Sequence, residues 1–397
     1  MAETPREAWI TGIGILSCLG EGPEAHWQAL NGDLPQTDAQ TFAPFVVHPI
    51  APVDFDKQIP KKGDQRQMEA WQRIGTYAAG LALDSAGLKG NAELLTRTDM
   101  IVAAGGGERD TNVDSAILTG VRTAENPAAF VNERLMNDLR PTLFLAQLSN
   151  LLAGNISIVH GVTGSSRTFM GEESAGVDAA RIAVSRILAG QGEISLVGSA
   201  FNGERRDLML QHEFGGSMLK GNYQPVWERQ SNPGIAFGSL GAFLVIEERA
   251  HAIARGIKPL ARLRSIASVR SRRKPGEITA GLQEMWNGLK SHVDTAHCIA
   301  LSGATGVEPA TSEERAFFAD HPGLAVRATG SYLGHAPEPQ FLMNLALATL
   351  ILNHGKLHPP RDASGVERAT DATVRQVLVT SVGTWRGEGM ALVESVS

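Results

Sequence analysis

The sequence predicts an α/β fold in which a mostly parallel β-sheet is covered by helices on both faces. Long apolar segments of strand character alternate with amphipathic helical segments, a pattern typical of such sheets. The chain has 397 residues, which suits two domains or one large fold built of two halves. Because the later segments repeat the pattern of the earlier ones, we predict two similar halves, residues 1–248 and 249–397.

The first half begins with a buried strand over Ala8 to Leu16, "AWITGIGIL", which runs into a glycine turn. An Ala-rich amphipathic helix is predicted from Trp71 to Ala86, with Gly87 as its C-terminal cap. A second buried strand occupies 99–107 and ends in three glycines, which allow the backbone a close approach to a neighbour or a ligand. The other predicted elements are a helix at 140–154 with Pro141 near its start and a terminal glycine, a helix followed by a buried strand at 177–200, and a strand followed by a helix at 241–256.

The second half repeats this alternation of strands and helices. The predicted strands are 260–268, 297–303 and 375–383, and the predicted helices are 277–290 and 340–354. The basic segment 268–277 and the Pro-containing segment 358–365 are predicted to be loops.

Composition excludes several classes of protein. The chain is 43% hydrophobic and 20% charged, and its net charge of -6 gives no overall attraction to nucleic acid or to an anionic membrane. Its two cysteines, Cys18 and Cys298, argue against a disulfide framework and a zinc site. The N-terminal residues do not resemble a signal peptide, and no segment approaches about 18 uninterrupted apolar residues. We therefore expect a cytoplasmic protein without metal.

The segment "GEESAG" (171–176) lies between a short apolar stretch and a strong helix. Strand, tight turn of small residues and helix is the arrangement that presents a nucleophile at a helix N-terminus. Such a turn normally carries Ser or Cys. Here it carries Glu172 and Glu173.

Several segments, spread over nearly the whole chain, together resemble the β-ketoacyl-[acyl carrier protein] synthases of the thiolase superfamily. They are "WITGIGILSCLGEG" (9–22), "KKGDQRQMEAWQRIGTYAAGLALDSAGL" (61–88), "RPTLFLAQLSNLLAGNISIVHGVTG" (140–164), "VDAARIAVSRILAGQGEISLVGSA" (177–200), "GIAFGSLGAFLVIEERAHAIARG" (234–256) and "TGSYLGH" (329–335). The resemblance implies a thiolase-like fold, in which two duplicated α/β halves form a five-layered αβαβα sandwich.

The resemblance also implies a chemistry. In that family a Cys at the helix N-terminus accepts an acyl chain from the phosphopantetheine of an acyl carrier protein, and two histidines assist a decarboxylative Claisen condensation. Neither a metal nor an organic cofactor is needed. The family forms dimers through the strand before the elbow, here near "SSRTFMG" (165–171), so we expect a homodimer or a heterodimer with a Cys-containing synthase.

This sequence departs from the family at most of the catalytic positions. Glu173 falls at the position of the Cys, Ser302 at that of the first His, and Gly330 at that of a Lys. His335 is retained at the position of the second His. The late glycine-rich loop becomes "VGTWRGEG" (382–389), and "APEPQ" (336–340) follows His335.

Each candidate also has a structural interpretation. Glu173 is either a carboxylate stabilised by the helix N-terminus that orients water or a malonyl group, or a plug in a silent site; the plug is the favoured interpretation. His335 is either a donor to a thioester or a residue that holds its loop, and Ser302 is favoured as structural. The three glycines at 105–107 lack a phosphate-binding pattern and favour tight packing.

Two basic clusters are candidates for docking an acidic carrier protein, although solvated loops are the usual explanation of such clusters. They are Arg270, Arg272, Arg273 and Lys274, and Lys61, Lys62 and Arg66.

Three functions are compatible with these observations. The favoured one is a non-condensing subunit, similar to a chain length factor, that pairs with an intact synthase in the biosynthesis of fatty acids or related acyl chains. The second is altered chemistry, such as a malonyl-carrier-protein decarboxylase or hydrolase. The third is the ordinary 3-oxoacyl synthase activity, which the absence of the Cys disfavours. Primary fatty acids, specialised lipids and polyketides are all compatible products.

Overall fold

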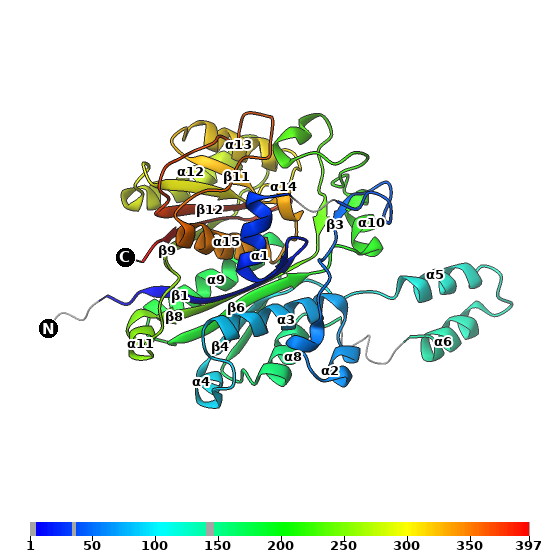
Figure 1. Ribbon diagram of the computed structural model, residues 1–397. Helices are drawn as coiled ribbons and strands as arrows, with labels where there is room; N and C mark the ends of the chain where they lie inside the picture. The colour runs from blue at the N-terminus through cyan, green and yellow to red at the C-terminus, as the bar shows by residue number, and fades with distance from the viewer. Residues whose placement is uncertain (1–4, 34–36, 140–146, 397) are drawn as a thin grey trace.

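The computed structural model describes residues 5–33, 37–139 and 147–396 (Figure 1). The described residues form an 11-stranded sheet of order β11-β10-β12-β13-β9-β1-β8-β6-β4-β5, with β2 on β1, and a small sheet of β3 and β7. The strands are β1 (Ala8–Ser17), β2 (Gly20–Glu21), β3 (Val47–His48), β4 (Asp99–Ala103), β5 (Ser166–Phe169), β6 (Ile194–Phe201), β7 (Phe237–Gly238), β8 (Leu240–Glu248), β9 (Ala261–Val269), β10 (Cys298–Ser302), β11 (Ala325–Ala328), β12 (Gln376–Val382) and β13 (Glu388–Glu394).

The large sheet repeats one pattern on each side of a central seam. On one side β1, β8 and β6 are antiparallel, and β6, β4 and β5 are parallel. On the other side β9, β13 and β12 are antiparallel, and β12, β10 and β11 are parallel. The seam itself is a short antiparallel pairing of β1 with β9. The prediction of a mostly parallel sheet is therefore wrong, because only the two outer parts are parallel.

Helices build the remaining layers. They are α1 (Gly22–Asn31), α2 (Lys62–Gln67), α3 (Ala70–Ser85), α4 (Ala92–Arg97), α5 (Thr111–Gly120), α6 (Pro127–Asn137), α8 (Leu151–His160), α9 (Glu173–Leu188), α10 (Arg206–Phe214), α11 (Arg249–Ala254), α12 (Glu277–Leu289), α13 (Ala310–Ala319), α14 (Gly330–Leu333) and α15 (Gln340–His354), with 3-10 turns at Phe55–Lys57, Val226–Ser231 and Lys290–His292.

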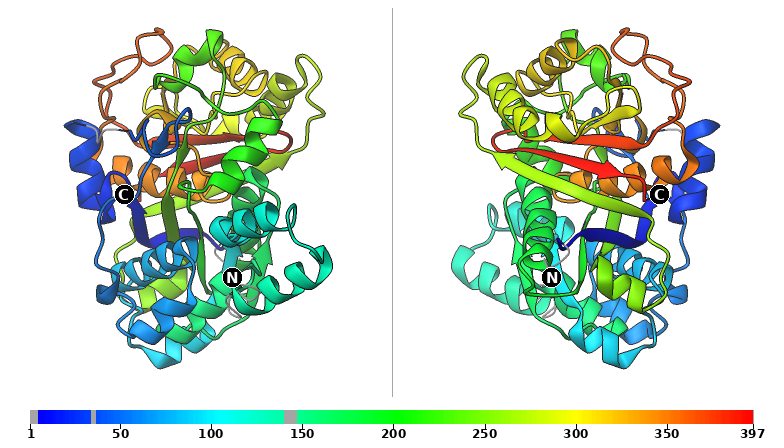
Figure 2. Two further views of the ribbon diagram at one scale, coloured as in Figure 1. Left: turned by 90° about the vertical axis from the view of Figure 1, so that its right-hand side faces the viewer. Right: turned by 90° about the vertical axis from the view of Figure 1, so that its left-hand side faces the viewer.

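The elements stack in five layers (Figure 1). Helices α9 and α15 form the middle layer and contact strands of both halves of the sheet. Helices α3 and α8 cover one outer face, and α12 and α13 cover the other. The side views in Figure 2 show the yellow helices and red strands of the C-terminal part above and the cyan helices of the N-terminal part below. The predicted boundary at residues 248/249 lies at the junction of β8 and α11 and stays a prediction.

Glycines in β1 let α3 lie close to the sheet. A Cβ atom at Gly14 would lie 2.1 Å from the carbonyl oxygen of Ala78, and one at Gly12 would lie 2.6 Å from that of Ala82. Neither distance is physically possible, so the "TGIGIL" pattern is a requirement of helix–strand packing.

One predicted helix is wrong in its bounds. The helix expected at 140–154 begins, within the described residues, at Leu151 and continues to His160, and residues 140–146 lie outside the described part. Gly154 lies inside the helix, and Gly161, with a φ of +77°, ends it. An interior glycine costs a helix only about 1 kcal/mol, which the apolar residues that follow it offset by burial.

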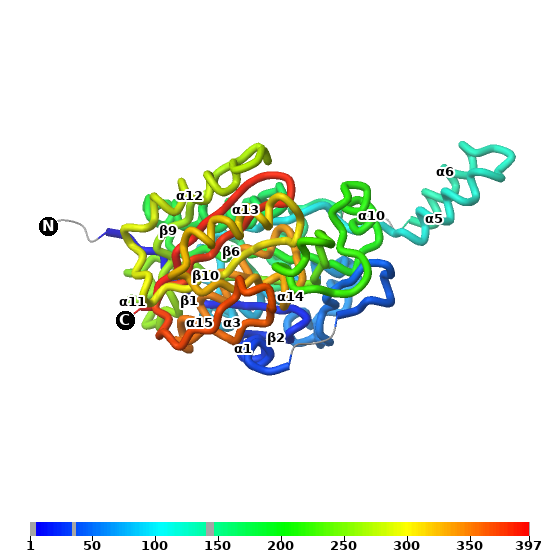
Figure 3. The backbone as a smooth tube through the Cα atoms, turned by 90° about the horizontal axis from the view of Figure 1, so that it is seen from above, coloured from blue at the N-terminus to red at the C-terminus, as the bar shows by residue number. Residues whose placement is uncertain are grey.

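Helices α5 and α6 form an arm that projects from the body, as the views in Figures 1 and 3 show. Neither helix has a buried residue. The arm also exposes large apolar side chains, namely Leu118, Leu135 and Met136. Among the residues that the structure describes, no helix is long and apolar enough to cross a membrane.

Candidate functional site

The predicted elbow is present between β5 and α9. The last residue before the helix, Glu172, has φ +57° and ψ -137°, a conformation that strains any residue with a side chain. Gly171 also has a positive φ, +135°. The strained turn places Glu173 at the first position of α9, where the helix dipole favours a negative charge.

The carboxylate of Glu173 is buried and accepts three hydrogen bonds at one oxygen. Its Oε1 lies 3.0 Å from His335 Nε2, 2.9 Å from Thr384 Oγ1 and 3.1 Å from the Thr384 backbone nitrogen. Glu173 is 3% exposed and His335 is 2% exposed. Within the described part of the chain, Glu173 Oε2 and His335 Nδ1 have no hydrogen-bond partner. The structure thus brings two of the three predicted site residues together.

The surroundings of Glu173 favour its ionised form. Burial alone would raise the pKa of this carboxyl group, but the hydrogen bond and charge of His335 and the Thr384 amide lower it below its usual value. An ionised carboxylate only accepts hydrogen bonds, so His335 Nε2 carries the proton that it donates to Glu173.

Two further carboxyl groups lie near Glu173. Burial raises the pKa of Glu338 to about 7, and the charges of Glu173 and Glu172 act in the same direction. Burial and the charge of Glu173 also raise the pKa of Glu172, against the effect of Arg386. A Cβ atom at Gly105 would lie 2.5 Å from Glu338 Oε1, whereas one at Gly106 would lie in open space. The predicted tight packing of the glycine loop therefore holds at Gly105 and is wrong at Gly106.

Ser302 is fully buried at the end of β10 and belongs to a separate group of side chains. Its hydroxyl accepts a hydrogen bond from the Ala304 amide and interacts with the carboxyl group of Glu314. Among the described contacts, none joins Ser302 to Glu173 or His335. Burial raises the pKa of Glu314 to about 7, and Thr380 Oγ1 donates a hydrogen bond to it.

The loop after β12 closes over the elbow. Thr384 bonds to Glu173, and the next residue, Trp385, stacks on His212 with ring centroids 4.9 Å apart. Burial and the charge of His335 together lower the pKa of His212 to about 4. The segment "VGTWRGEG" is predicted above to replace a family loop, but Thr384 is not among the predicted site residues, although its hydroxyl is a signal in the sequence that could have identified it. Glu338 and Glu314 are not among the predicted site residues either.

In each basic cluster, at least one side chain is already bonded to a carboxylate of this chain. Arg273 points inward, where it donates to Glu388 Oε1 and to the Gly383 carbonyl oxygen. Its neighbours Arg270, Arg272 and Lys274 are exposed. In the second cluster, Lys62 lies 2.5 Å from Asp56 Oδ1. Docking of a carrier protein at either cluster stays a prediction.

Neither cysteine can replace a nucleophile at the elbow. Burial raises the pKa of both the Cys18 and the Cys298 thiol to about 12, which keeps them protonated. The part of the chain that the structure describes contains no group of three or more His, Cys, Asp or Glu side chains arranged to hold a metal ion.

Comparisons with known sequences identify relatives. A model of the family described as "Beta-ketoacyl synthase, N-terminal domain" matches residues 6–252. The chain is 24% identical over 264 residues to "3-oxoacyl-[acyl-carrier-protein] synthase 2" of Vibrio cholerae serotype O1 and 26% identical over 270 residues to the Vibrio harveyi protein of that name. These matches cover 64% and 65% of this chain but only 60% and 61% of the two relatives.

Solved structures match over the whole chain. "The ishigamide ketosynthase/chain length factor" is similar with a TM-score of 0.79 and 20% identity, and the match covers 99% of this chain and 100% of that one. A complex of a type II polyketide ketosynthase with its acyl-carrier protein, AntDE:AntF, has a TM-score of 0.75, 16% identity and the same coverage of both chains. A beta-ketoacyl synthase of Burkholderia phymatum has a TM-score of 0.78, 16% identity and the same coverage again. The predicted thiolase-like fold is confirmed.

Proposed function

Because this chain belongs to the beta-ketoacyl synthase family, we propose that it is the non-condensing partner of an intact synthase, similar to a chain length factor, in the biosynthesis of fatty acids or related acyl chains. The main support for the proposal is that a carboxylate of this chain fills the elbow and takes up the hydrogen-bond donors around it. Glu173 occupies the start of α9, and His335 and Thr384 already donate to its Oε1.

The chemistry at the elbow argues against condensation by this chain. Acyl transfer to a carboxylate would give a mixed anhydride, a reactive species that a buried site would have to protect from water. The hydrogen-bond donors of His335 and Thr384 at the elbow are already occupied by Glu173, so they are not free for an acyl oxygen. Ser302 lies apart from His335. Its carboxyl neighbour Glu314 has a pKa raised to about 7, which is still far below that of an alcohol, so Glu314 cannot hold the Ser302 hydroxyl ionised.

The exposed arm and edge of the sheet support a partner subunit. Strand β5 is the last strand of the sheet on its side, and Ile158 and Met170, exposed by 72% and 64%, lie on α8 and just after β5. Like the apolar residues of the arm, these side chains are of the kind that an associating protein buries. One structural neighbour is itself named "The ishigamide ketosynthase/chain length factor".

Co-expression with a Cys-containing synthase from the same source tests the proposal. We expect a stable heterodimer that elongates malonyl- and acyl-carrier protein, and no condensation by this chain alone. Chain-length analysis of the product, with and without this subunit, measures its contribution. A chain that purifies only as a homodimer and changes no partner's product contradicts the proposal.

A second candidate is a malonyl-thioester decarboxylase or hydrolase. The buried Glu173–His335 pair favours it, because such a pair can orient water or a malonyl carboxylate. Incubation of the wild type and of Glu173→Ala with malonyl-carrier protein separates the candidates. Release of product by the wild type alone supports this second activity, and equal background rates exclude it.

A further inference from the structure

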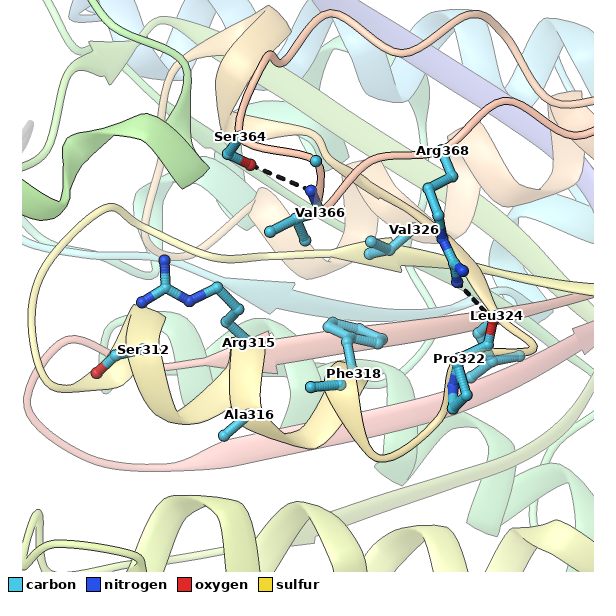
Figure 4. A pocket seen from close by; sticks show the side chains of 12 residues that line it. Ser312, Arg315, Ala316, Phe318, Pro322, Leu324, Val326, Ser364, Val366 and Arg368 are labelled. Atoms are coloured by element: carbon cyan, nitrogen blue, oxygen red, sulfur yellow. Dashed lines mark hydrogen bonds between the residues drawn. The ribbon is translucent and has the colours of Figure 1, made fainter.

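A cavity of about 610 Å³ lies far along the chain from the elbow residues, between α13 and the loop 364–368 (Figure 4). Its wall is apolar. Phe318, Leu324 and Val326 line it and are 6%, 3% and 2% exposed. Contacts behind the wall fix the Phe318 ring, which meets Phe317 at 5.3 Å and Trp227 at 6.5 Å between ring centroids. A volume between about 300 and 1,000 Å³ is typical of sites for small organic ligands.

Two arginines stand at opposite ends of this apolar wall, as Figure 4 shows. Arg368 reaches down from the loop and donates to the Pro322 carbonyl oxygen. Arg315 rises from α13 toward Ser364, and within the described chain its guanidinium makes no ion pair or hydrogen bond. The lining residues include no Asp or Glu. A cavity with two positive charges and no negative charge favours an anion.

We propose that this cavity binds an amphipathic carboxylate, with its head on Arg315 and its alkyl chain along Phe318, Val326 and Val366. Arg315 supplies the planar pair of N–H donors that a carboxylate accepts in bidentate form. The alkyl chain leaves water when it packs on this rigid apolar wall. Arg368, which is tied to Pro322, closes the far end.

This site is independent of the proposed function. None of its lining residues belongs to the elbow, to the loop over it or to the arm. A chain that fails to pair with a synthase can still bind the carboxylate, and a chain that pairs can fail to bind it, so the two proposals are tested separately.

Calorimetric titration of the full chain with sodium octanoate tests the proposal. Three matched probes are compared with it. Acetate lacks the long alkyl chain, 1-octanol lacks the charge, and n-octylammonium carries a positive charge in place of the negative one. We expect one octanoate per chain and at least about tenfold weaker binding of each other probe, which is about 1.4 kcal/mol, because acetate lacks the alkyl chain and the other two lack the carboxylate that Arg315 binds. Equal binding of 1-octanol, equal binding of acetate, or no octanoate binding overturns the proposal.

Two variants locate the binding. Arg315→Gln should weaken octanoate binding about tenfold and leave the weak binding of 1-octanol unchanged. Ala319→Glu, on the exposed side of α13 at the cavity, should weaken it as well by placing a negative charge there. Arg122→Gln, an exposed position in the arm, is the control and should bind as the wild type does. Unchanged affinity in both cavity variants would falsify the assignment.

Discussion

At the scale of single residues, Glu173 unites the site, because one oxygen of its carboxylate accepts from His335 and from both donors of Thr384. The second oxygen is buried without a partner within the described residues. This arrangement satisfies the donors around the start of α9 from inside the protein, so no substrate oxygen is needed to complete them.

Glu173→Gln tests how much the negative charge contributes to stability. The pKa of Glu173 is lowered in the folded protein, so its contribution is fully present above the ordinary value near 4.5 and is lost as the pH falls through the folded value. We expect Glu173→Gln to lower the free energy of unfolding by about 1.5–3 kcal/mol at pH 7, and by less in acid. Urea denaturation at both pH values measures it.

The exposed arm residue Glu133 offers a matched control. Glu133→Gln should change the free energy of unfolding by no more than about 0.5 kcal/mol at either pH. A loss at Glu173 that is the same at neutral and acidic pH would show that the side chain acts through packing and that its charge contributes nothing.

Glu314 has the opposite dependence on pH. Its folded pKa is raised to about 7, so the folded state holds a proton that the unfolded state releases near 4.5. The stability that this proton provides is present below 4.5 and is lost as the pH rises through about 7. Glu314→Gln keeps an acceptor for Thr380 and removes the titration. We expect the thermal midpoint of the variant to fall less than that of the wild type between pH 5 and pH 8.

Scanning calorimetry between pH 5 and pH 8 measures how steeply the thermal midpoint falls with pH in the wild type and in the variant. Glu338 titrates in the same range, with its pKa also raised to about 7. The double variant Glu314→Gln/Glu338→Gln should therefore have a flatter profile than either single variant. Profiles that all run parallel to the wild type would contradict the assignment of these protons.

At the scale of elements, the middle layer depends on a glycine. A Cβ atom at Gly176, in the first turn of α9, would lie 2.3 Å from the backbone oxygen of Glu338, just before α15 begins. Gly176→Ala should cost about 1–3 kcal/mol of stability, because the backbone cannot move aside as a flexible side chain would. Denaturant unfolding of the purified variant measures the loss.

Gly288, near the end of α12, has open space around it and is the matched control. Gly288→Ala should raise the free energy of unfolding by about 0.5–1 kcal/mol through helix propensity alone. If Gly176→Ala raised the free energy of unfolding as much as Gly288→Ala does, the close approach of α9 to the segment before α15 would not exclude a side chain at position 176.

The elements themselves were largely predictable from local patterns. Apolar runs identified β1, β6 and β10, and the small residues of "GEESAG" identified the elbow. The antiparallel pairing of β8 with its neighbours was not predicted, because apolar periodicity reports burial and not strand direction. The contacts of Thr384 and Glu338 were also missed, since both approach Glu173 from segments more than 160 residues away in the sequence.

At the scale of the whole molecule, the arm is the feature that contributes no side chain to the buried core of the body. Its helices have no buried residue, so a polar substitution there should leave the stability of the isolated chain unchanged. If the chain pairs with a synthase as proposed, Leu135→Ser/Met136→Lys should instead reduce co-purification with that partner at least about tenfold, because apolar area lost from an interface weakens association.

Pull-down from co-expressing cells measures the co-purification, and thermal melting of the chain alone measures its stability. Phe214→Ser, on the exposed side of α10 outside the arm, is the control, since Phe214 is 83% exposed. Undiminished co-purification of the arm variant would remove the arm from the interface and leave the β5 edge as the remaining candidate.

The same exposed arm has a consequence for how the cell must handle this polypeptide. Under the proposed pairing, a chain made in excess of its synthase partner would display Leu118, Leu135 and Met136 to chaperones and proteases, which recognise exposed apolar segments. Its steady-state level should therefore follow the supply of the partner more closely than its own rate of synthesis. Synthesis of the two subunits in equal amounts would then affect the yield of the complex as much as any residue at the elbow does.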